Sequence, residues 1–221
     1  MEQGFFITGT DTSVGKTWAT VTLMRYFQAQ GKTVVGMKPV ASGCEWIDGR
    51  LRNEDALMLQ KNASVMLDYG LVNPYAYVQP VSPHLACEDN SVELNKVVAV
   101  FNQIKQTADI VLVEGVGGWL VPLNHQGDDV QAMAKALNLP VILVVAIRLG
   151  CINHARLTYQ TIKNSGLTCA GWLATHVDAQ MLKQNENIET LQQLINVPLL
   201  GVLPYSEKAD FDLFIKTIDF I

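Results

Sequence analysis

The feature that most constrains the fold is a regular alternation of short apolar runs with longer amphipathic stretches. Several runs are continuous and rich in β-branched residues, which is typical of parallel strands covered on both faces by helices. We predict strands at Phe5–Thr8, Thr33–Lys38, Ile110–Glu114, Val141–Val145, Cys169–Thr175 and Leu199–Leu203. Helices are expected at Lys16–Gln30, Asn53–Asn62, Leu94–Thr107, Asp129–Leu137, Asn153–Ser165 and Asn185–Ile195. The pattern indicates the α/β class: one doubly wound, mostly parallel sheet with helices on both faces.

The strand–helix rhythm continues to the end of the 221 residues without a linker, an internal repeat or a low-complexity segment. We therefore expect one domain, residues 1–221, which is long enough to bury a core. Residues Tyr69–Asn90 break the rhythm because they are rich in proline and aromatic residues. This segment is expected to be an ordered excursion outside the sheet, and loops of such length usually have a function.

Composition excludes several classes of protein. The net charge is −5 and no basic run occurs, so we expect no nucleic-acid partner. No apolar run approaches the roughly 18 residues that a membrane span needs, and no signal peptide is evident. The cysteines Cys44, Cys87, Cys151 and Cys169 are scattered without Cys-x-x-Cys spacing. Reduced, mostly buried thiols and a cytoplasmic protein are expected.

The stretch "TGTDTSVGKT" ends like a phosphate-binding loop, but its first glycine comes one position early. Gly9 precedes Thr10, which stands where the pattern Gly-x-x-x-x-Gly-Lys-Ser/Thr has glycine. The stretch follows an apolar strand and opens a helix, whose first amides attract phosphate oxygens. Lys16 would reach the β- and γ-phosphates, and the Thr17 hydroxyl would bind Mg²⁺. A plain glycine turn with a surface lysine is the alternative.

Two carboxylates are candidates for the metal. Glu114 ends the strand in "DIVLVEGVGG", at the sheet edge where ligands bind in open parallel sheets. A carboxylate so placed is costly to bury unless it is paired or metal-bound. Asp55 is either a second metal ligand or an ordinary acidic residue in the first turn of a helix. The following glycines, Gly115, Gly117 and Gly118, form either a simple turn or a close approach to substrate.

Lys38 follows another apolar strand, in "VVGMKPVASG", and so projects from the same edge. A second cation there would stabilise charge on a transferred phosphoryl group or on an anionic acceptor. Ser42 would hydrogen-bond that acceptor. An ordinary exposed lysine is the alternative for Lys38. The residues thus indicate ATP-dependent phosphoryl transfer to an anionic acceptor.

Ten segments in this order resemble the dethiobiotin synthetase family of P-loop NTPases: "GTDTSVGKT", "KPVASG", "LRNEDALMLQ", "VNPYAY", "SPHLA", "VLVEGVGGWLVPL", "LPVILVV", "RLGCINHARLT", "GLTCAGW" and "PLLGVLP". The early glycine is the family's own form of the loop. The resemblance implies ring-closing carboxylation of 7,8-diaminopelargonate with CO₂ and ATP, through a phosphorylated carbamate, to dethiobiotin.

The resemblance also implies roles for particular residues. Lys16 and Lys38 would flank the carbamate and the γ-phosphoryl oxygens, while Thr12 and Ser42 position the carbamate. The implied Mg²⁺ ligands are Thr17, Asp55 and Glu114. The implied ATP contacts are Ser13, Val14, Gly15, Lys16, Thr17, Trp18, Asp55, Glu114, Gly115, Val116, Gly117, Thr175, His176, Pro204, Tyr205 and Ser206.

The distant carboxylate of the substrate would be received by Ser82 and by the "LGCIN" turn, with Gly150, Cys151 and Asn153. In the family a second subunit donates this turn, so the resemblance implies a homodimer with composite active sites. The backbone amides at the start of the predicted helix Asn153–Ser165 would bind a carboxylate, just as those at the start of the predicted helix Lys16–Gln30 would bind a phosphate.

Four positions depart from well-known members of the family. Thr175 and His176 replace an Asn-Asp pair whose asparagine reads adenine, and Ser13 replaces a glutamate found in some members. A threonine hydroxyl cannot make the two-point contact of an asparagine. Base specificity is therefore expected to be relaxed or supplied by backbone near residues 204–206. Asn187 replaces a tyrosine that contacts the substrate tail.

Two alternative functions remain. Another amide-forming ligase of the same loop class, such as a cobyrinate amidase-type synthetase, usually carries a glutaminase domain for which this chain has no room. A switch ATPase of the ParA/MinD type carries an additional lysine in its loop, where this chain has Asp11, Thr12 and Ser13. Such ATPases also tend to end in a basic amphipathic helix, whereas "KADFDLFIKTIDFI" has two lysines and three aspartates and looks like a last helix packed on the domain.

Overall fold

The computed structural model describes residues 4–220, and within them six parallel strands form one sheet in the order β10-β9-β8-β1-β7-β2. The predicted class is confirmed, and each predicted strand is present. The strands are β1 (Gly4–Gly9), β2 (Val34–Met37), β7 (Ile110–Gly118), β8 (Val141–Ala146), β9 (Cys169–Thr175) and β10 (Leu199–Leu203). The order places β1, which leads into the phosphate loop, between β7 and β8 at the centre of the sheet.

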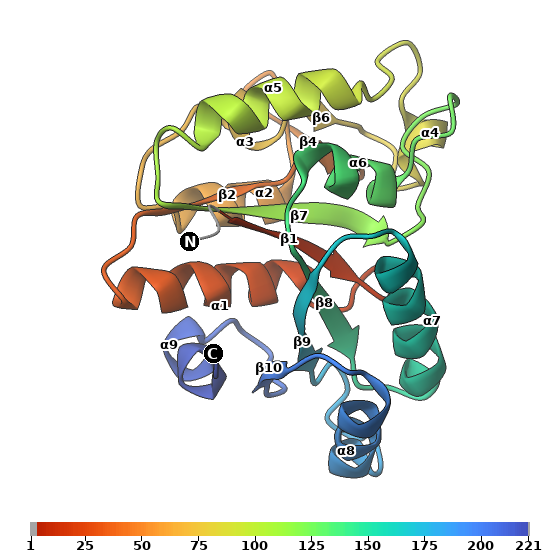
Figure 1. Ribbon diagram of the computed structural model, residues 1–221. Coiled ribbons are helices and arrows are strands. Elements are labelled where there is room, and N and C mark those ends of the chain that lie inside the picture. Colours follow the sequence, from red (N-terminus) through yellow and green to blue (C-terminus); the bar gives the residue numbers. More distant parts are fainter. Residues whose placement is uncertain (1–3, 221) are drawn as a thin grey trace.

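Each predicted helix is also present, with ends that differ by at most three residues. Asn53 and Asp129 cap two of them, because each side chain accepts a hydrogen bond from an amide of the first turn. In Figure 1, α1 lies on one side of β1 and β7, and α5 and α6 lie on the other. The helices are α1 (Lys16–Ala29), α2 (Glu54–Lys61), α5 (Leu94–Ile104), α6 (Val130–Leu137), α7 (Cys151–Asn164) and α8 (Gln184–Leu194). Among residues 4–220, no helix is long and apolar enough to cross a membrane.

Strands β1 and β8 are buried at every residue, as expected for strands covered on both faces. Strand β7 runs four residues beyond the predicted end at Glu114, because the glycine run continues the strand to Gly118 instead of forming a turn. Glu114 lies beside Ile7 of β1, and Gly118 lies beside Gly9. The glycine run therefore lies alongside the start of the phosphate loop.

The predicted excursion is ordered and contains α3 (Tyr69–Val72), β6 (Tyr75–Ala76) and α4 (Pro83–Ala86). Strand β6 pairs with β3 (Val40–Ala41), which begins two residues after Lys38. A second small addition is the hairpin of β4 (Glu45–Ile47) and β5 (Arg50–Arg52). These short elements were not predicted, because so few residues carry no periodicity.

The predicted C-terminal helix is confirmed but short: α9 (Phe211–Phe214) is followed by a 3₁₀ turn, η1 (Ile215–Thr217). Phe214 is fully buried and lies 5.7 Å, ring centre to ring centre, from Trp18 of α1. The end of the chain therefore packs on the first helix, as Figure 1 shows.

The cysteines follow the expected pattern of small buried side chains. Cys44, Cys87 and Cys151 are buried, and Cys169 is half-buried. All four are free thiols.

Candidate active site

The loop from β1 to α1 has the backbone geometry of an anion site. Gly15, the N-cap of α1, has φ 83°, and a Cβ there would lie 3.2 Å from Cγ2 of Thr175. Only glycine fits this left-handed position without strain. Within residues 4–220, the amides of Gly15, Lys16 and Thr17 donate no hydrogen bond. They remain available to a phosphate at the positive end of the helix.

The side chain of Lys16 folds back over this loop. It is 7% exposed, and its ammonium donates a hydrogen bond to the carbonyl of Asp11 at 2.8 Å. Burial, and then the charge of Lys38, lowers the pKa of Lys16 to about 8. The Asp11 carboxylate accepts from the Thr12 amide at 2.7 Å and pairs with Arg148 at 2.5 Å. Asp11 thus links the phosphate loop to Arg148, which follows β8.

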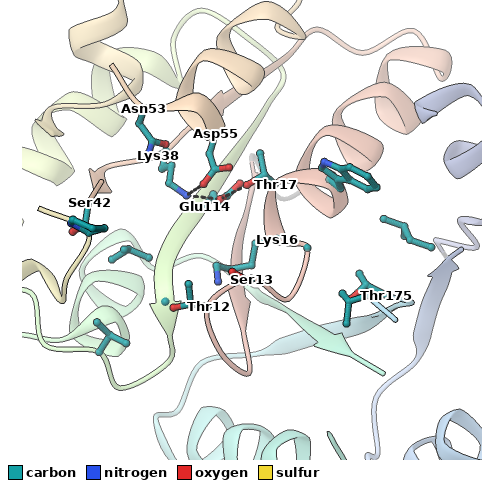
Figure 2. A pocket seen from close by; sticks show the side chains of 18 of the residues that line it. Thr12, Ser13, Lys16, Thr17, Lys38, Ser42, Asn53, Asp55, Glu114 and Thr175 are labelled. Carbon is teal, nitrogen blue, oxygen red and sulfur yellow. Dashed lines mark hydrogen bonds and ion pairs between the residues drawn. The ribbon is translucent and has the colours of Figure 1, made fainter. Parts of the chain in front are cut away.

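Four side chains from four elements meet behind the loop (Figure 2). The Thr17 hydroxyl donates to Glu114 Oε1 at 2.9 Å, and Lys38 Nζ lies 2.6 Å from the same oxygen. Lys38 Nζ also lies 2.8 Å from Asp55 Oδ2. Glu114 is fully buried and Lys38 is 4% exposed, so the central pair is shielded from water. Lys38 and Glu114 thus lie together at one edge of the sheet, as expected, and Asp55 lies beside them.

The charges of this cluster shift one another's pKa values. Burial alone would lower the pKa of Lys38, but the negative charges of Glu114 and Asp55 outweigh it and raise that pKa. Burial alone would raise the pKa of Asp55, but the charge and hydrogen bond of Lys38 lower it. These shifts favour the charged forms of both Lys38 and Asp55.

The oxygens of the cluster suit a hard divalent cation. Glu114 Oε2 is buried and has no hydrogen-bond partner in the described part of the chain. A buried carboxylate oxygen left unpaired is costly, and a cation ligand would satisfy it. Residues 4–220 contain no group of three or more His, Cys, Asp or Glu side chains that could hold a metal. Thr17, Asp55 and Glu114 instead offer a hydroxyl and two carboxylates, a donor set that fits Mg²⁺ completed by phosphate and water.

The excursion holds Lys38 in place, a role that sequence reasoning missed. The Lys38 amide donates to the carbonyl of Val72 at 2.8 Å, and the Asn73 side chain donates to the carbonyl of Lys38 at 2.7 Å. The Tyr69 hydroxyl donates to Asn73 Oδ1 at 3.0 Å and accepts from the amide of Asn53 at 2.7 Å. Tyr69 and Asn73 thus join the start of α2, which carries Asp55, to Lys38.

A cavity of about 680 Å³ lies over the loop and the cluster. Figure 2 shows Ser42 on one side of Lys16 and Thr175 on the other. The structure brings most of the predicted residues to its wall: Thr12, Ser13, Gly15, Lys16, Thr17, Trp18, Lys38, Ser42, Asp55, Ser82, Glu114, Val116, Gly117, Thr175, His176, Pro204, Tyr205 and Ser206. Val14 and Gly115 do not line the cavity. Residues that were not predicted also line it: Asn53, Pro80, Val81, Pro83, Val121, Val177 and Leu203.

The end of the cavity near Ser42 combines polar and apolar groups. The hydroxyl of Ser42 is buried without a hydrogen-bond partner in the described residues. Ser82 lies 3.0 Å from Nδ1 of His84 and donates weakly to the carbonyl of Pro122 at 3.4 Å. The prolines of the segment Tyr69–Asn90 were the sequence signal that could have predicted the apolar wall at this end of the cavity. This end suits a molecule with an apolar chain and a polar head.

At the opposite end, the hydroxyl of Thr175 is already engaged. It donates to the carbonyl of Val14 in the loop at 2.7 Å. The imidazole of His176 is hydrogen-bonded to Gln184 of α8. Neither polar side chain is thus without a partner within the chain.

The turn at the start of α7 lies apart from this cavity. Gly150, Cys151 and Asn153 do not line it. Helix α7 begins at Cys151, two residues before the predicted start, with Gly150 as a left-handed N-cap at φ 93°. The Cys151 thiol donates to Oδ1 of Asn187 at 3.6 Å. These residues and Asn187 form one corner of the molecule that the cavity of the same chain does not reach.

Solved structures with a similar fold include cell division proteins and an ATPase of the ParA family. The cell division ATPase MinD of Pyrococcus furiosus has a TM-score of 0.58 at 17% identity, covering 99% of this chain and 89% of that one. The MinD cell division protein of Aquifex aeolicus has a TM-score of 0.56 at 15% identity, covering 98% and 87%. At such identities the likeness concerns the fold alone.

The sequence comparisons are more specific. A family model described as an AAA domain matches residues 3–211. The ATP-dependent dethiobiotin synthetase BioD of Nitrosospira multiformis is 47% identical over 95% of this chain and 92% of its own length. That of Aromatoleum aromaticum is 45% identical over 94% and 93%. Relatives of this identity and coverage show that the chain belongs to the ATP-dependent dethiobiotin synthetase family.

Proposed function

We propose that this protein makes dethiobiotin from 7,8-diaminopelargonate, CO₂ and ATP. The single observation that carries the proposal is the convergence of Lys16, Lys38, Thr17, Asp55 and Glu114 on one cavity, in a chain that is 45–47% identical to dethiobiotin synthetases along more than nine-tenths of its length. The cavity has room for a nucleotide at one end and an amphipathic acceptor at the other.

The reaction forms two C–N bonds and breaks one P–O bond of ATP. One amine of the acceptor attacks CO₂ and loses a proton, which gives a carbamate. A carbamate oxygen attacks the γ-phosphorus, and ADP leaves. The second amine then attacks the carbamoyl carbon, loses a proton and expels phosphate, which closes the ring. The attacking amine belongs to the same molecule as the activated carbonyl, so proximity supplies much of the rate.

The proposed role of each residue follows from its position in the cavity. The loop amides and Lys16 bind the phosphates, and Lys38 stabilises negative charge on the carbamate and on the transferred phosphoryl group. The Ser42 hydroxyl, which has no partner in the described structure, donates to the carbamate together with Thr12. Desolvation strengthens these contacts, because the Lys38–Glu114 pair is buried.

We propose that Thr17, Asp55 and Glu114 hold Mg²⁺, which would neutralise charge on the β- and γ-phosphates when bound. The uncommitted Oε2 of Glu114 and the Thr17 hydroxyl support this assignment. Lys38 pairs with the same two carboxylates, so ligation of a cation would loosen its hold on them. Its ammonium would then be free to turn toward the acceptor.

We further propose a homodimer with composite sites. Gly150, Cys151 and Asn153 do not line the cavity of their own chain, so a role in binding substrate would require the cavity of another chain. The exposed Leu149, 95% accessible, and Leu157, 62% accessible, flank this turn as apolar contacts for a second subunit. Ser82 of one chain and the α7 turn of the other would together hold the distant carboxylate.

The test is phosphate release from MgATP with and without 7,8-diaminopelargonate and bicarbonate, with dethiobiotin detected by mass spectrometry. Release that needs both compounds and yields dethiobiotin is expected. Phosphate release that is indifferent to both would remove the synthetase proposal and favour a switch ATPase. The Lys38→Ala variant serves as the matched control, because it removes the second cation and leaves the phosphate loop intact.

A further inference from the structure

Thr175 makes an unusual contact for a residue at the nucleotide end of the cavity. It is the last residue of β9 and is 4% exposed. Its hydroxyl lies 2.7 Å from the carbonyl of Val14, 161 positions earlier in the chain, and 3.4 Å from the carbonyl of Val145. A hydroxyl has one hydrogen to donate, so the shorter contact is the bond.

The carbonyl that Thr175 holds belongs to the peptide unit between Val14 and Gly15. In a trans peptide the C=O and N–H groups point in opposite directions. Gly15 lines the cavity, and its amide has no acceptor within residues 4–220. A bond that fixes the carbonyl of Val14 on the sheet side therefore fixes the amide of Gly15 on the cavity side.

We propose that Thr175 is a positioning residue for the phosphate loop, acting through Val14 to aim the Gly15 amide at the nucleotide phosphates. This rests on the proposed use of ATP. Thr175 packs directly on Gly15, since a Cβ at that glycine would meet Cγ2, Cβ and Oγ1 of Thr175 at 3.2, 3.4 and 3.5 Å. The threonine therefore also enforces glycine at the N-cap.

The same geometry argues against Thr175 as a hydrogen-bond donor to the base. Its single hydrogen is used by the loop, and Val14 is fully buried, so water cannot replace the bond. The effect of Thr175 on nucleotides should then depend on phosphate and not on the base. Recognition of the base falls to other groups at this end, among them the half-exposed Tyr205 and the backbone near Pro204.

The test compares Thr175→Val, which keeps shape and removes the hydroxyl, with Thr175→Ser, which keeps the hydroxyl and removes the methyl. Dissociation constants are measured by calorimetry for MgATP, MgGTP and magnesium tripolyphosphate, which has no base. Thr175→Val is expected to weaken all three equally, about ten-fold, which corresponds to about 1.4 kcal/mol. Thr175→Ser should restore most of the affinity.

Three outcomes would overturn the proposal. A changed ratio of MgATP to MgGTP affinity, with tripolyphosphate unaffected, would make Thr175 a base contact. Unchanged affinities of Thr175→Val for all three ligands would mean that Thr175 has no role in positioning the loop. If Thr175→Ser bound the ligands as weakly as Thr175→Val, the effect would come from side-chain packing and not from the hydroxyl. If Thr175→Val does not fold, Thr175→Cys, with a similar volume and a weaker donor, takes its place. Failure of wild type to bind MgATP would instead refute the proposed function.

Discussion

Lys38 and Glu114 form a buried ion pair, with 2.6 Å between Nζ and Oε1. The pairing follows from sheet register. Met37 of β2 lies beside Val113 of β7, so the next residue on each strand faces the other at the carboxyl edge. One pair of adjacent strands thereby brings the proposed second cation of the reaction into contact with a proposed metal ligand.

Lys38→Met should both unfold more easily and lose turnover. Removing one partner of a buried ion pair leaves the other charge uncompensated, at a cost of about 3–5 kcal/mol. Loss of a charge that stabilises the transition state lowers kcat by about 100-fold or more. Urea unfolding and steady-state kinetics measure the two effects. Lys61→Met is the matched control, because Lys61 is exposed at the end of α2. A Lys38→Met protein as stable as Lys61→Met would contradict a buried pair.

Ser42→Ala should separate function from stability. The hydroxyl of Ser42 has no partner in the described structure, so its removal leaves no new unsatisfied group and the free energy of unfolding should stay within about 1 kcal/mol of wild type. The KM for 7,8-diaminopelargonate should rise about ten-fold, as expected for one lost hydrogen bond to an anion.

Ser91→Ala provides the comparison for Ser42→Ala. The Ser91 hydroxyl is also buried without a partner, but Ser91 does not line the cavity. Both variants should be similarly stable, and only Ser42→Ala should affect KM. An equal effect of both on turnover would show that Ser42 acts through the fold.

The sequence predicted the sheet and the phosphate site because both depend on local signals. The apolar runs of the strands, the glycines between elements and the spacing of the phosphate loop each lie within about ten residues. Because ligands bind at the carboxyl ends of parallel strands, Lys38 and Glu114 were then expected at the same edge of the sheet. Asp55 stayed ambiguous because an acid at a helix start has two explanations. In the structure Asp55 both lies in the first turn of α2 and pairs with Lys38, so each explanation describes part of its setting.

What the sequence could not predict depends on contacts between distant residues. Tyr69 and Asn73 read as parts of a loop, and nothing local says that they hold the backbone of Lys38 and Asn53. The hydroxyl of Thr175 donates to the carbonyl of Val14, which lies 161 positions away in the sequence. The sequence placed Thr175 among the ATP contacts without the two-point base contact of an asparagine, but it gave no sign that the hydroxyl bonds to the phosphate loop.

Tyr69 and Asn73 should be coupled in stability and in turnover. Tyr69→Phe removes the hydroxyl that joins Asn53 to Asn73, and Asn73→Ala removes the donor to the Lys38 carbonyl. Each change should destabilise the protein by about 1–3 kcal/mol. Because the residues share one network, the double variant should lose less than the sum, with a coupling of at least about 0.5 kcal/mol. Additive losses would show that the two residues act independently.

Stability should fall at high pH through Cys169. Burial raises the pKa of this thiol to about 11, above its value in the unfolded chain. The unfolded state then loses its proton first, so this contribution is complete below pH about 9 and is lost as pH rises toward about 11. Cys169→Ala should flatten the decline in unfolding free energy over that range. Alkylation of native protein should be slow at pH 8, and rapid alkylation of Cys169 at that pH would contradict the raised pKa.

Complementation between two inactive variants tests the composite site. Lys38→Ala disables the cavity, while Asn153→Asp places a negative charge at the start of α7, where it favours the helix but repels a substrate carboxylate. Each variant alone should be nearly inactive. In co-expressed dimers half the molecules carry one copy of each, and each of these has one intact site, so about one quarter of wild-type activity should return. Dimers without restored activity would show that the α7 turn serves its own chain or none, and a monomer with full activity would rule out the composite site.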